Sequence, residues 1–157
     1  MRFTAVVFLA SAALVGCGKD SGATINCSEF ASAFTTEDSA GQVANSFATG
    51  EGITFHIQIT NNNSSSQTLT PNTCPQVFLD VRDSASQLVW EYGNNVLMSC
   101  PPTHTYAAGE VGNIVVEWDQ RRFNDNTQVP SGTYTAFMLD STECSDQLDK
   151  SVEFEIQ

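Results

Sequence analysis

From residue 53 onward, hydrophobic and polar residues alternate along the chain with a period of two. In residues 53–60, Ile53, Phe55, Ile57 and Ile59 lie on one face and polar residues lie on the other. This alternation is typical of a β-strand with one buried face. Further strands are expected at residues 67–70, 76–82, 88–92, 104–106, 111–118, 133–139 and 152–156. No segment keeps a helical period beyond two turns, so the pattern predicts an all-β protein.

Turn residues separate these strands at short intervals. Residues 61–66 form a polar cluster, and residues 83–86 join two strands as a predicted hairpin. Short strands in such number favour two packed antiparallel sheets, because a single open sheet would leave long edges exposed. We therefore predict an immunoglobulin-like antiparallel β-sandwich of seven to nine strands. Tyr134, which follows the turn at Ser131-Gly132, either forms a tyrosine corner or simply packs on the sheet.

The first 16 residues have the pattern of an export signal. Arg2 precedes an apolar run from Ala5 to Val15, which is too short to span a bilayer. The segment Leu14-Val15-Gly16-Cys17 resembles the lipobox of bacterial lipoproteins, in which cleavage precedes a lipid-modified cysteine. We expect residues 1–16 to be removed and Cys17 to be lipidated. The alternative is an ordinary secretory signal that leaves Cys17 as a free thiol, and that chain would also be exported.

The remaining chain has the length of one domain. Residues 17–50 are rich in Ser, Thr, Ala and Gly and show no sustained period. We expect them to supply the lipidated cysteine, a tether and an irregular lead-in, with a short strand or turn between Ile25 and Phe34. The sandwich is expected over residues 51–157. These features predict a lipoprotein held at a membrane of the cell envelope, on its periplasmic or outer surface.

The chain contains five cysteines. If one of them carries lipid, four remain, and an even number in an exported chain predicts two disulfides. Three connectivities are possible, and spacing alone does not choose among them. We favour Cys74 with Cys100 and Cys27 with Cys144. On the loop-entropy model these bridges contribute roughly 3.5 and about 5 kcal/mol before native strain is counted.

The composition excludes some classes of partner. Six Lys or Arg stand against 18 Asp or Glu, which gives a formal net charge of −12. Nucleic-acid binding needs clustered cations, and Arg121-Arg122 is the only basic pair in the sequence. We therefore expect no nucleic-acid partner. Attachment to an anionic membrane would come from lipid on Cys17 and not from a basic patch.

Candidate catalytic and metal-binding residues do not form a known arrangement. His56 lies on the polar face of its predicted strand, and His104 lies between two threonines, so surface placement explains both. No G-x-S-x-G or H-E-x-x-H motif is present, and no cysteine pair has zinc-ligand spacing. We therefore expect no enzyme, no metal and no cofactor. Asp119 and residues 124–126 offer oxygen ligands for calcium, but their spacing does not fit an EF-hand loop, and turn chemistry explains these residues without a metal.

A series of short segments occurs in the order found in a known family. They are residues 57–62, 78–83, 88–90, 108–110, 116–119 and 129–134. The strand that ends at Trp118 and the turn Val129-Pro130-Ser131-Gly132-Thr133-Tyr134 are the most specific of them. Over roughly residues 50 to 140 the chain resembles the BsuPI family, the intracellular proteinase inhibitor domain. The resemblance implies an immunoglobulin-type sandwich that inhibits a serine protease.

An inhibitor must present a loop that binds a protease and is held too rigidly to be released as product. The segment Met98-Ser99-Cys100-Pro101-Pro102 has the required features, because its prolines fix the backbone and a bridge at Cys100 would pin it. We take it as the candidate protein-contact loop, and a bridged connector between sheets is the alternative. The expected function is an exported, lipid-anchored, protein-binding module that inhibits a protease. The alternative is a structural or assembly lipoprotein of the cell envelope that uses sheet-edge pairing.

Overall fold

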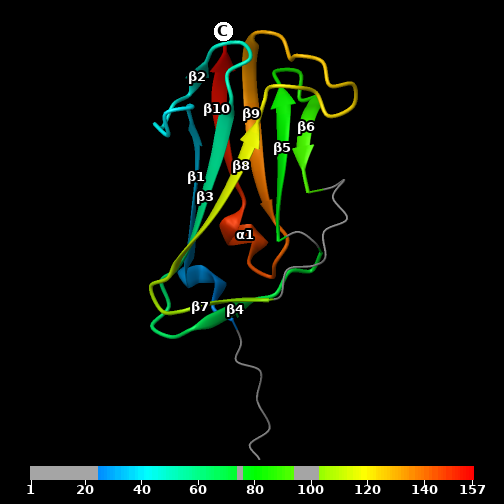
Figure 1. Ribbon diagram of the computed structural model, residues 1–157. Coiled ribbons are helices and arrows are strands. Elements are labelled where there is room, and N and C mark those ends of the chain that lie inside the picture. Colours follow the sequence, from blue (N-terminus) through cyan, green and yellow to red (C-terminus); the bar gives the residue numbers. More distant parts are fainter. Residues whose placement is uncertain (1–24, 74–75, 94–102) are drawn as a thin grey trace, which may run out of the picture.

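Two β-sheets face each other and enclose a hydrophobic core (Figure 1). The computed structural model describes residues 25–73, 76–93 and 103–157. A three-stranded sheet has the order β1-β3-β8, and a five-stranded sheet has the order β2-β10-β9-β5-β6. The elements are η1 (Cys27–Glu29), β1 (Phe30–Glu37), β2 (Ser46–Phe47), β3 (Ile53–Asn61), β4 (Gln67–Leu69), β5 (Val77–Asp83), β6 (Leu88–Tyr92), β7 (His104–Tyr106), β8 (Val111–Trp118), β9 (Gly132–Asp140), α1 (Ser145–Leu148) and β10 (Lys150–Ile156). The predicted all-β sandwich is confirmed.

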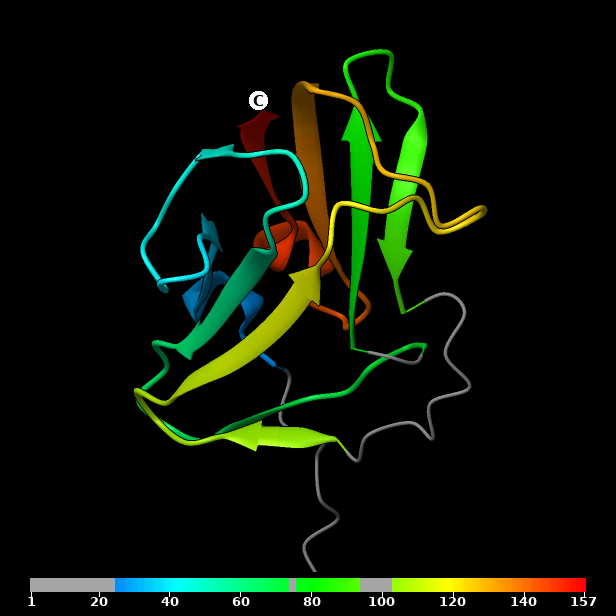
Figure 2. The ribbon, with the colours of Figure 1, turned by 45° about the horizontal axis from the view of Figure 1, so that its top comes forward.

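Every strand predicted from residue 53 onward is present, with its ends within two residues of the prediction. The strands of the two facing sheets pair antiparallel, except that β2 runs parallel to β10. β5 and β6 form the predicted hairpin, with a bulge between Val81 and Arg82. β4 and β7 form a separate two-stranded sheet across one end (Figure 2). No helix in the described ranges is long and apolar enough to cross a membrane.

The core lies between the two sheets and is centred on Phe55 of β3. Its ring centroid lies 5.9 Å from that of Trp90 in β6, 6.4 Å from that of Trp118 in β8, and 6.1 Å from that of Phe154 in β10. Trp118 also meets Tyr134 of β9 edge to face, at 6.3 Å. Large aromatic side chains from both sheets therefore fill one common interior.

The segment before residue 50 differs from our expectation. In place of the short strand or turn expected between Ile25 and Phe34 it contains the longer strand β1, which pairs with β3 along its whole length. Phe30 and Phe34 of β1 are buried, and Phe47 of β2 is 1% exposed. These side chains belong to the core, so the sandwich begins well before residue 51.

Two polar residues occupy inward-facing positions of β1, so the sequence there lacks the apolar–polar alternation of a typical half-buried strand. The Ser32 hydroxyl donates to the Leu148 carbonyl over 2.7 Å, and the Thr36 hydroxyl donates to the Ala44 carbonyl over 2.5 Å. These bonds satisfy hydroxyls that would otherwise be costly to bury. The apolar–polar alternation is interrupted for this reason, although the strand is regular.

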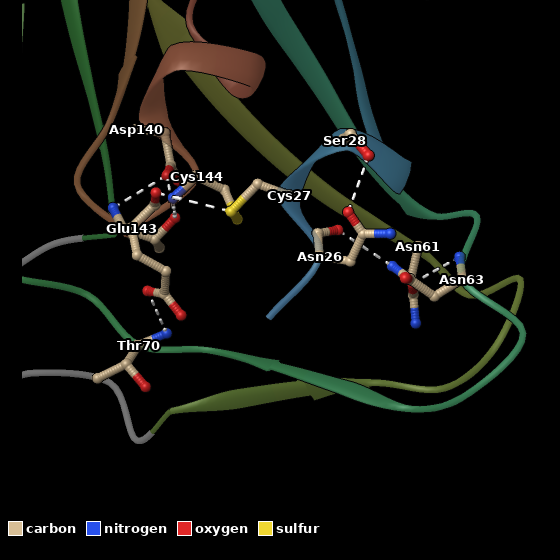
Figure 3. The surroundings of a disulfide bond; sticks show 10 residues. Asn26, Cys27, Ser28, Asn61, Asn63, Thr70, Asp140, Glu143 and Cys144 are labelled. Carbon is tan, nitrogen blue, oxygen red and sulfur yellow. Dashed lines mark hydrogen bonds between the residues drawn. A yellow bond between two sulfur atoms is a disulfide. The ribbon is translucent and has the colours of Figure 1, made fainter. Parts of the chain in front are cut away.

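A disulfide joins Cys27 in η1 to Cys144, which lies directly before α1 (Figure 3). This is the pairing we favoured, and it connects residues 117 apart in the sequence. Cys144 is 1% exposed and Cys27 is only partly buried, so the bond is shielded from solvent on its Cys144 side. The bridge ties the start of β1 to the connection between β9 and β10. The expected second bridge, Cys74 with Cys100, lies outside the described residues and stays a prediction.

Tyr134 forms the tyrosine corner that was one of two interpretations of its sequence context. Its hydroxyl donates to the backbone carbonyl of Pro130, 2.6 Å away and four residues upstream. Burial raises the pKa of the phenol, so it stays a neutral donor at physiological pH. The bond fastens the end of the loop between β8 and β9 to the start of β9.

Candidate functional site

The candidate contact loop Met98-Ser99-Cys100-Pro101-Pro102 and the lipidation residue Cys17 lie outside the described residues. Both therefore stay predictions. Within the described ranges, the features suited to binding a protein gather at the end of the sandwich opposite η1 (Figure 1). They are the loop between β8 and β9 and a cleft beside its first residues.

We call residues 121–127 the tip loop, because they form the outermost part of the connection between β8 and β9 (Figure 2). Its backbone closes on itself: the Arg122 N–H donates to the Thr127 carbonyl over 2.8 Å, and the Asn126 N–H donates to the Arg122 carbonyl over 3.0 Å. Below these bonds Arg121 pairs with Gln128 as an isolated β-bridge. The tip loop is thus a hydrogen-bonded turn that is supported by one β-bridge, and it is not an open, extended loop.

Side chains within the tip loop add to this closure. The Asp125 carboxylate accepts hydrogen bonds from the Thr127 N–H at 2.9 Å and the Thr127 hydroxyl at 2.7 Å. The hydroxyl bond and then the backbone bond lower the pKa of the Asp125 carboxyl. The Arg121 guanidinium donates to the Asn126 carbonyl at 2.9 Å. Turn chemistry therefore accounts for the acidic tip, and no group of three metal-binding side chains occurs in the part of the chain that the structure describes.

Gln120 anchors the base of the tip loop, a role that nothing in the neighbouring sequence indicates. It is fully buried and has a positive φ of 59°. Its side-chain carbonyl accepts from the Gly50 N–H at 2.7 Å and from the Gln128 amide at 3.1 Å, while its own amide donates to the Ala48 carbonyl at 2.9 Å. One side chain thus joins the tip loop to the segment between β2 and β3. A glutamine beside a turn is normally expected to be solvent-exposed. Only the tertiary contacts therefore reveal that Gln120 anchors the tip loop.

The tip loop displays an aromatic side chain directly after two cationic residues. Phe123 is 46% exposed, and its N–H donates to the Val89 carbonyl at 3.2 Å, which fixes the tip loop against β6. Arg121 and Arg122 precede it on an otherwise acidic chain. Aromatic residues and arginine dominate the energetic centres of protein interfaces. The tip loop therefore carries the side chains and the rigidity of a protein-contact element.

A cleft of about 690 Å³ opens beside the tip loop, where β1 ends, β3 begins and β8 ends. Both tryptophans of the chain, Trp90 and Trp118, line it. Its acidic lining residues are Glu37, Asp38, Glu117 and Asp119. The cleft thus combines an aromatic wall with a carboxylate rim.

His104 is exposed, as its sequence context indicates, and His56 is half-buried on the polar face of β3. His56 contacts the Glu37 carboxylate at 2.8 Å and the Asn113 side-chain oxygen at 3.2 Å. His104 is 51% exposed and lies 3.3 Å from the Glu110 carboxylate. These contacts are with carboxylates and an amide, not with a hydroxyl or thiol that a histidine base would activate.

Residues 42–143, roughly two thirds of the chain, match the model of the BsuPI family, described as intracellular proteinase inhibitor. The chain belongs to the BsuPI family. No curated protein matches the chain. The matched segment contains the tip loop, Gln120 and both cleft tryptophans, whereas Cys27, Cys144 and β10 lie outside it. The BsuPI match therefore covers the tip loop and most of the cleft, but not Glu37 and Asp38 of the cleft and not the disulfide.

Several solved structures of other proteins are similar to this chain. An alkylpurine DNA glycosylase from Pseudomonas fluorescens has a TM-score of 0.50 and 15% identity, over 82% of this chain and 30% of that chain. A β-glucosidase from Erythrobacter marinus has a TM-score of 0.49 and 13% identity, over 82% of this chain and 15% of that chain. The CARDB domain of a Pyrococcus furiosus protein has a TM-score of 0.42 and 9% identity, over 80% of this chain and 89% of that chain. This BsuPI-family chain thus spans under a third of the glycosylase, and that likeness concerns the fold alone.

Proposed function

We propose that this chain is an exported, lipid-anchored protein-binding module that inhibits a protease and catalyses no reaction itself. Membership of a proteinase inhibitor family supports inhibition. The signal pattern before Cys17 supports export and lipid attachment. The family description is of an intracellular inhibitor, so an exported member would act on a protease of the envelope or its surroundings.

The preorganised tip loop is the observation that carries this proposal. A loop that is already ordered loses little conformational entropy on binding, so more of its contact energy appears as affinity. Residues 122–126 form a closed turn and not an extended strand. We therefore propose that the tip loop enters the protease as a rigid wedge with Phe123 in an apolar pocket, and that it is not held like a peptide substrate.

The orientation of the sandwich is consistent with an anchored inhibitor. η1, close to the first described residue, lies at the end opposite the tip loop (Figure 1). A lipid on Cys17 would therefore hold the molecule by the η1 end. The tip loop would face away from the membrane, where a protease can reach it.

An inhibition assay on a panel of serine proteases tests the proposal. The chain from Gly18 keeps every residue of the sandwich and avoids the lipid. We expect this chain to inhibit at least one protease, and Phe123→Ala to raise the inhibition constant about tenfold or more, because an interface anchor is lost. Leu139→Ala is the matched control, since Leu139 is 39% exposed on β9 and lies outside the tip loop. Equal effects of the two variants would remove the tip loop from the interface.

The predicted contact loop before residue 103 gives the assay a second arm. A Met98→Gly, Ser99→Asp double variant leaves the tip loop intact. If this variant abolishes inhibition and Phe123→Ala does not, the contact lies in Met98-Ser99-Cys100-Pro101-Pro102. Inhibition that survives the double variant unchanged would exclude that loop.

The membrane anchor has its own test. Non-reduced mass spectrometry of the mature protein from membranes should give an N-terminal peptide that begins with acylated Cys17. It should also show a mass lower by two hydrogens for each disulfide. An unmodified Cys17 in a secreted, soluble product would overturn the anchoring.

The alternative role, assembly of the envelope without inhibition, is favoured by one observation. β8 is the outer strand of its sheet, and Val111 and Val115 on it are 45% and 59% exposed. An exposed strand edge can receive a strand from another protein. If no protease is inhibited and the intact lipidated protein crosslinks through β8 to an envelope component, this role replaces the first.

A further inference from the structure

We propose that the free edge of β8 binds an extended strand of a partner protein, with basic residues at the ends of that strand and apolar residues between them. Within the described ranges β8 pairs only with β3. Binding of this kind requires neither protease inhibition nor a lipid anchor, and the assembly role described above leaves the chemistry of the partner strand open. The free backbone groups of β8, the apolar side chains beneath its edge and the charges at its ends define this chemistry.

The backbone groups at the outer edge of β8 are unpaired in the described part of the chain. The Asn61 N–H donates to the Glu110 carbonyl at 3.0 Å, so in this antiparallel ladder the even-numbered residues of β8 bond to β3. The N–H and C=O groups of Val111, Asn113 and Val115 therefore point away from β3. No other backbone hydrogen bond from a described segment reaches these residues. A strand laid along this edge would thus find donors and acceptors in register.

The other outer strands of the two sheets are short or covered. Val43 and Ala44 pair back onto the end of β1, and α1 and β10 also contact this strand. β2 has two residues, and the Phe123 N–H donates to the Val89 carbonyl of β6. β8 has none of these protections, because it spans eight residues, contains no lysine or proline and pairs with β3 without a bulge. An edge of this kind readily accepts another strand.

Inward-facing apolar side chains lie half-buried beneath the edge. The ring centroids of Trp90 and Trp118 are 5.8 Å apart, so β6 and β8 lie on the same side of the sandwich. Ile114 of β8 and Trp90 and Tyr92 of β6 are only partly buried, although their register partners in the two sheets are fully buried. A strand added to β8 would place its inward side chains over these residues. Apolar residues at alternate positions of the partner strand would therefore be buried.

The charges near β8 select the ends of the partner strand. Residues 111–116 carry no charge, whereas Glu110 precedes them and Glu117 follows them. Glu117 is exposed and points to the same outer face as Val111 and Val115. A basic residue opposite Glu117 would form a cross-strand ion pair, and an acidic residue there would be repelled. A second copy of β8 contains no basic residue, so a basic-ended strand from another protein fits this edge better.

A strand peptide provides a direct assay. The probe is acetyl-Lys-Val-Thr-Val-Thr-Val-Lys-amide, whose valines face inward when its lysines and threonines lie on the outer face with Glu117. Trp90 lies beneath the edge, so tryptophan fluorescence should report saturable binding of this peptide to the soluble chain. The same peptide with glutamate in place of both lysines should bind about tenfold more weakly. No saturable binding of the probe, or equal binding of the two peptides, would overturn the assignment of a basic-ended partner.

Peptide N-methylation separates strand pairing from adhesion to an apolar surface. In an added strand only alternate N–H groups point to β8, and they belong to the residues on the outer face. N-methylation of both threonines should therefore abolish saturable binding. N-methylation of the first and last valines should change the affinity by less than about threefold, because their N–H groups point away from β8. Equal effects of the two modified peptides would overturn strand pairing.

A pair of variants at Val115 tests the position of the site on the protein. Val115→Pro removes an N–H that points away from β3, at a position where an edge strand tolerates proline, and should abolish binding. Val115→Thr keeps this N–H and the β-branched shape, and should bind the probe within about twofold of the parent chain. Thermal unfolding checks that both variants are folded, and if Val115→Pro is not, the N-methylated peptides decide.

Two outcomes of the variant experiment count against the proposal. Unchanged binding by Val115→Pro would move the peptide away from the edge of β8. Sedimentation of the parent chain as a dimer that Val115→Pro dissociates would make a second copy the occupant. The assay contains no protease, so strand binding and inhibition succeed or fail independently.

Discussion

At one end of the sandwich a disulfide joins Cys27 to Cys144, whereas at the other end the tip loop is held by hydrogen bonds that converge on Gln120. The disulfide end carries η1 and α1 and lies nearer the predicted anchor (Figure 3). The opposite end exposes Phe123 and opens the cleft. A covalent bond thus secures the end at which the described chain begins, and polar contacts secure the end that carries the proposed contact element.

The two ends also use buried polar groups differently. Near the disulfide, the Asp140 carboxylate accepts from the Thr142 N–H at 2.9 Å and from the Thr142 hydroxyl, which in turn accepts from the Cys144 N–H at 3.1 Å. At the tip-loop end, the buried polar group is the neutral amide of Gln120. Changes at the disulfide end should therefore alter global stability and pH dependence, and changes at Gln120 should mainly alter the order of the tip loop.

The largest expected effect comes from removing the disulfide. A Cys27→Ala, Cys144→Ala double variant should lower the free energy of unfolding by about 3 to 5 kcal/mol, because the unfolded chain regains the freedom of a long loop. Denaturant unfolding of the two proteins measures the difference. Under conditions where the variant is still folded, its inhibition constant should match that of the parent chain. A variant that unfolds like its parent but inhibits poorly would reverse the roles of the two ends.

The second effect concerns the anchor of the tip loop. Gln120→Ala removes the partner of the Gly50 N–H and the Ala48 carbonyl, and should cost about 2 kcal/mol of stability. It should also speed hydrogen exchange in residues 121–127, since the base of the tip loop loses its fastening. Gln147→Ala, at an exposed position on α1, is the control and should change neither quantity. Unchanged exchange in the tip loop would show that its backbone turn is sufficient without Gln120.

The smallest effect is a difference in pH dependence between the two ends. Burial raises the pKa of Asp140, so the folded state holds this proton to higher pH than the unfolded chain does. Its contribution to stability is present at low pH and is lost as pH rises through the folded pKa. The Thr127 hydroxyl lowers the pKa of Asp125, whose contribution is present above the unfolded pKa and is lost as pH falls through the folded one.

Carboxyl-carbon NMR titration measures both pKa values directly. We expect Asp140 to titrate above the usual aspartate range and Asp125 below it. Thr127→Ala should return the pKa of Asp125 towards the usual range and leave that of Asp140 unchanged. If Asp140→Asn gains no stability relative to the parent chain as pH rises, burial of Asp140 does not set the pH dependence at the disulfide end.

The sequence predicted the strands of the sandwich from residue 53 onward because their inward positions are apolar. In β3, Ile53, Phe55, Ile57 and Ile59 are all at most 1% exposed, as their alternation indicates. β1 was predicted only as a short strand or turn between Ile25 and Phe34, because Ser32 and Thr36 occupy inward positions. A pattern of apolar residues cannot show that a hydroxyl will find a carbonyl elsewhere in the chain.

The candidate site was less accessible to sequence reasoning than the fold. From the sequence, the tip loop was recognised only by the turn residues 124–126 and by the basic pair Arg121-Arg122. Nothing local marks Gln120 as buried, since its partners Gly50 and Ala48 are about 70 residues away. The cleft is built from the ends of three strands and from Trp90 in the facing sheet. Such a site exists only when those elements are placed together.

By itself, the sequence determined the fold class, the positions of the regular strands and the predicted export signal. These features follow from side-chain polarity over a few neighbouring residues, which a linear pattern records. The tertiary structure alone decided that β1 completes the first sheet, that Gln120 anchors the tip loop, and that four acidic residues and two tryptophans share one cleft. Each of these depends on contacts between distant segments, and such contacts form only once the two sheets pack.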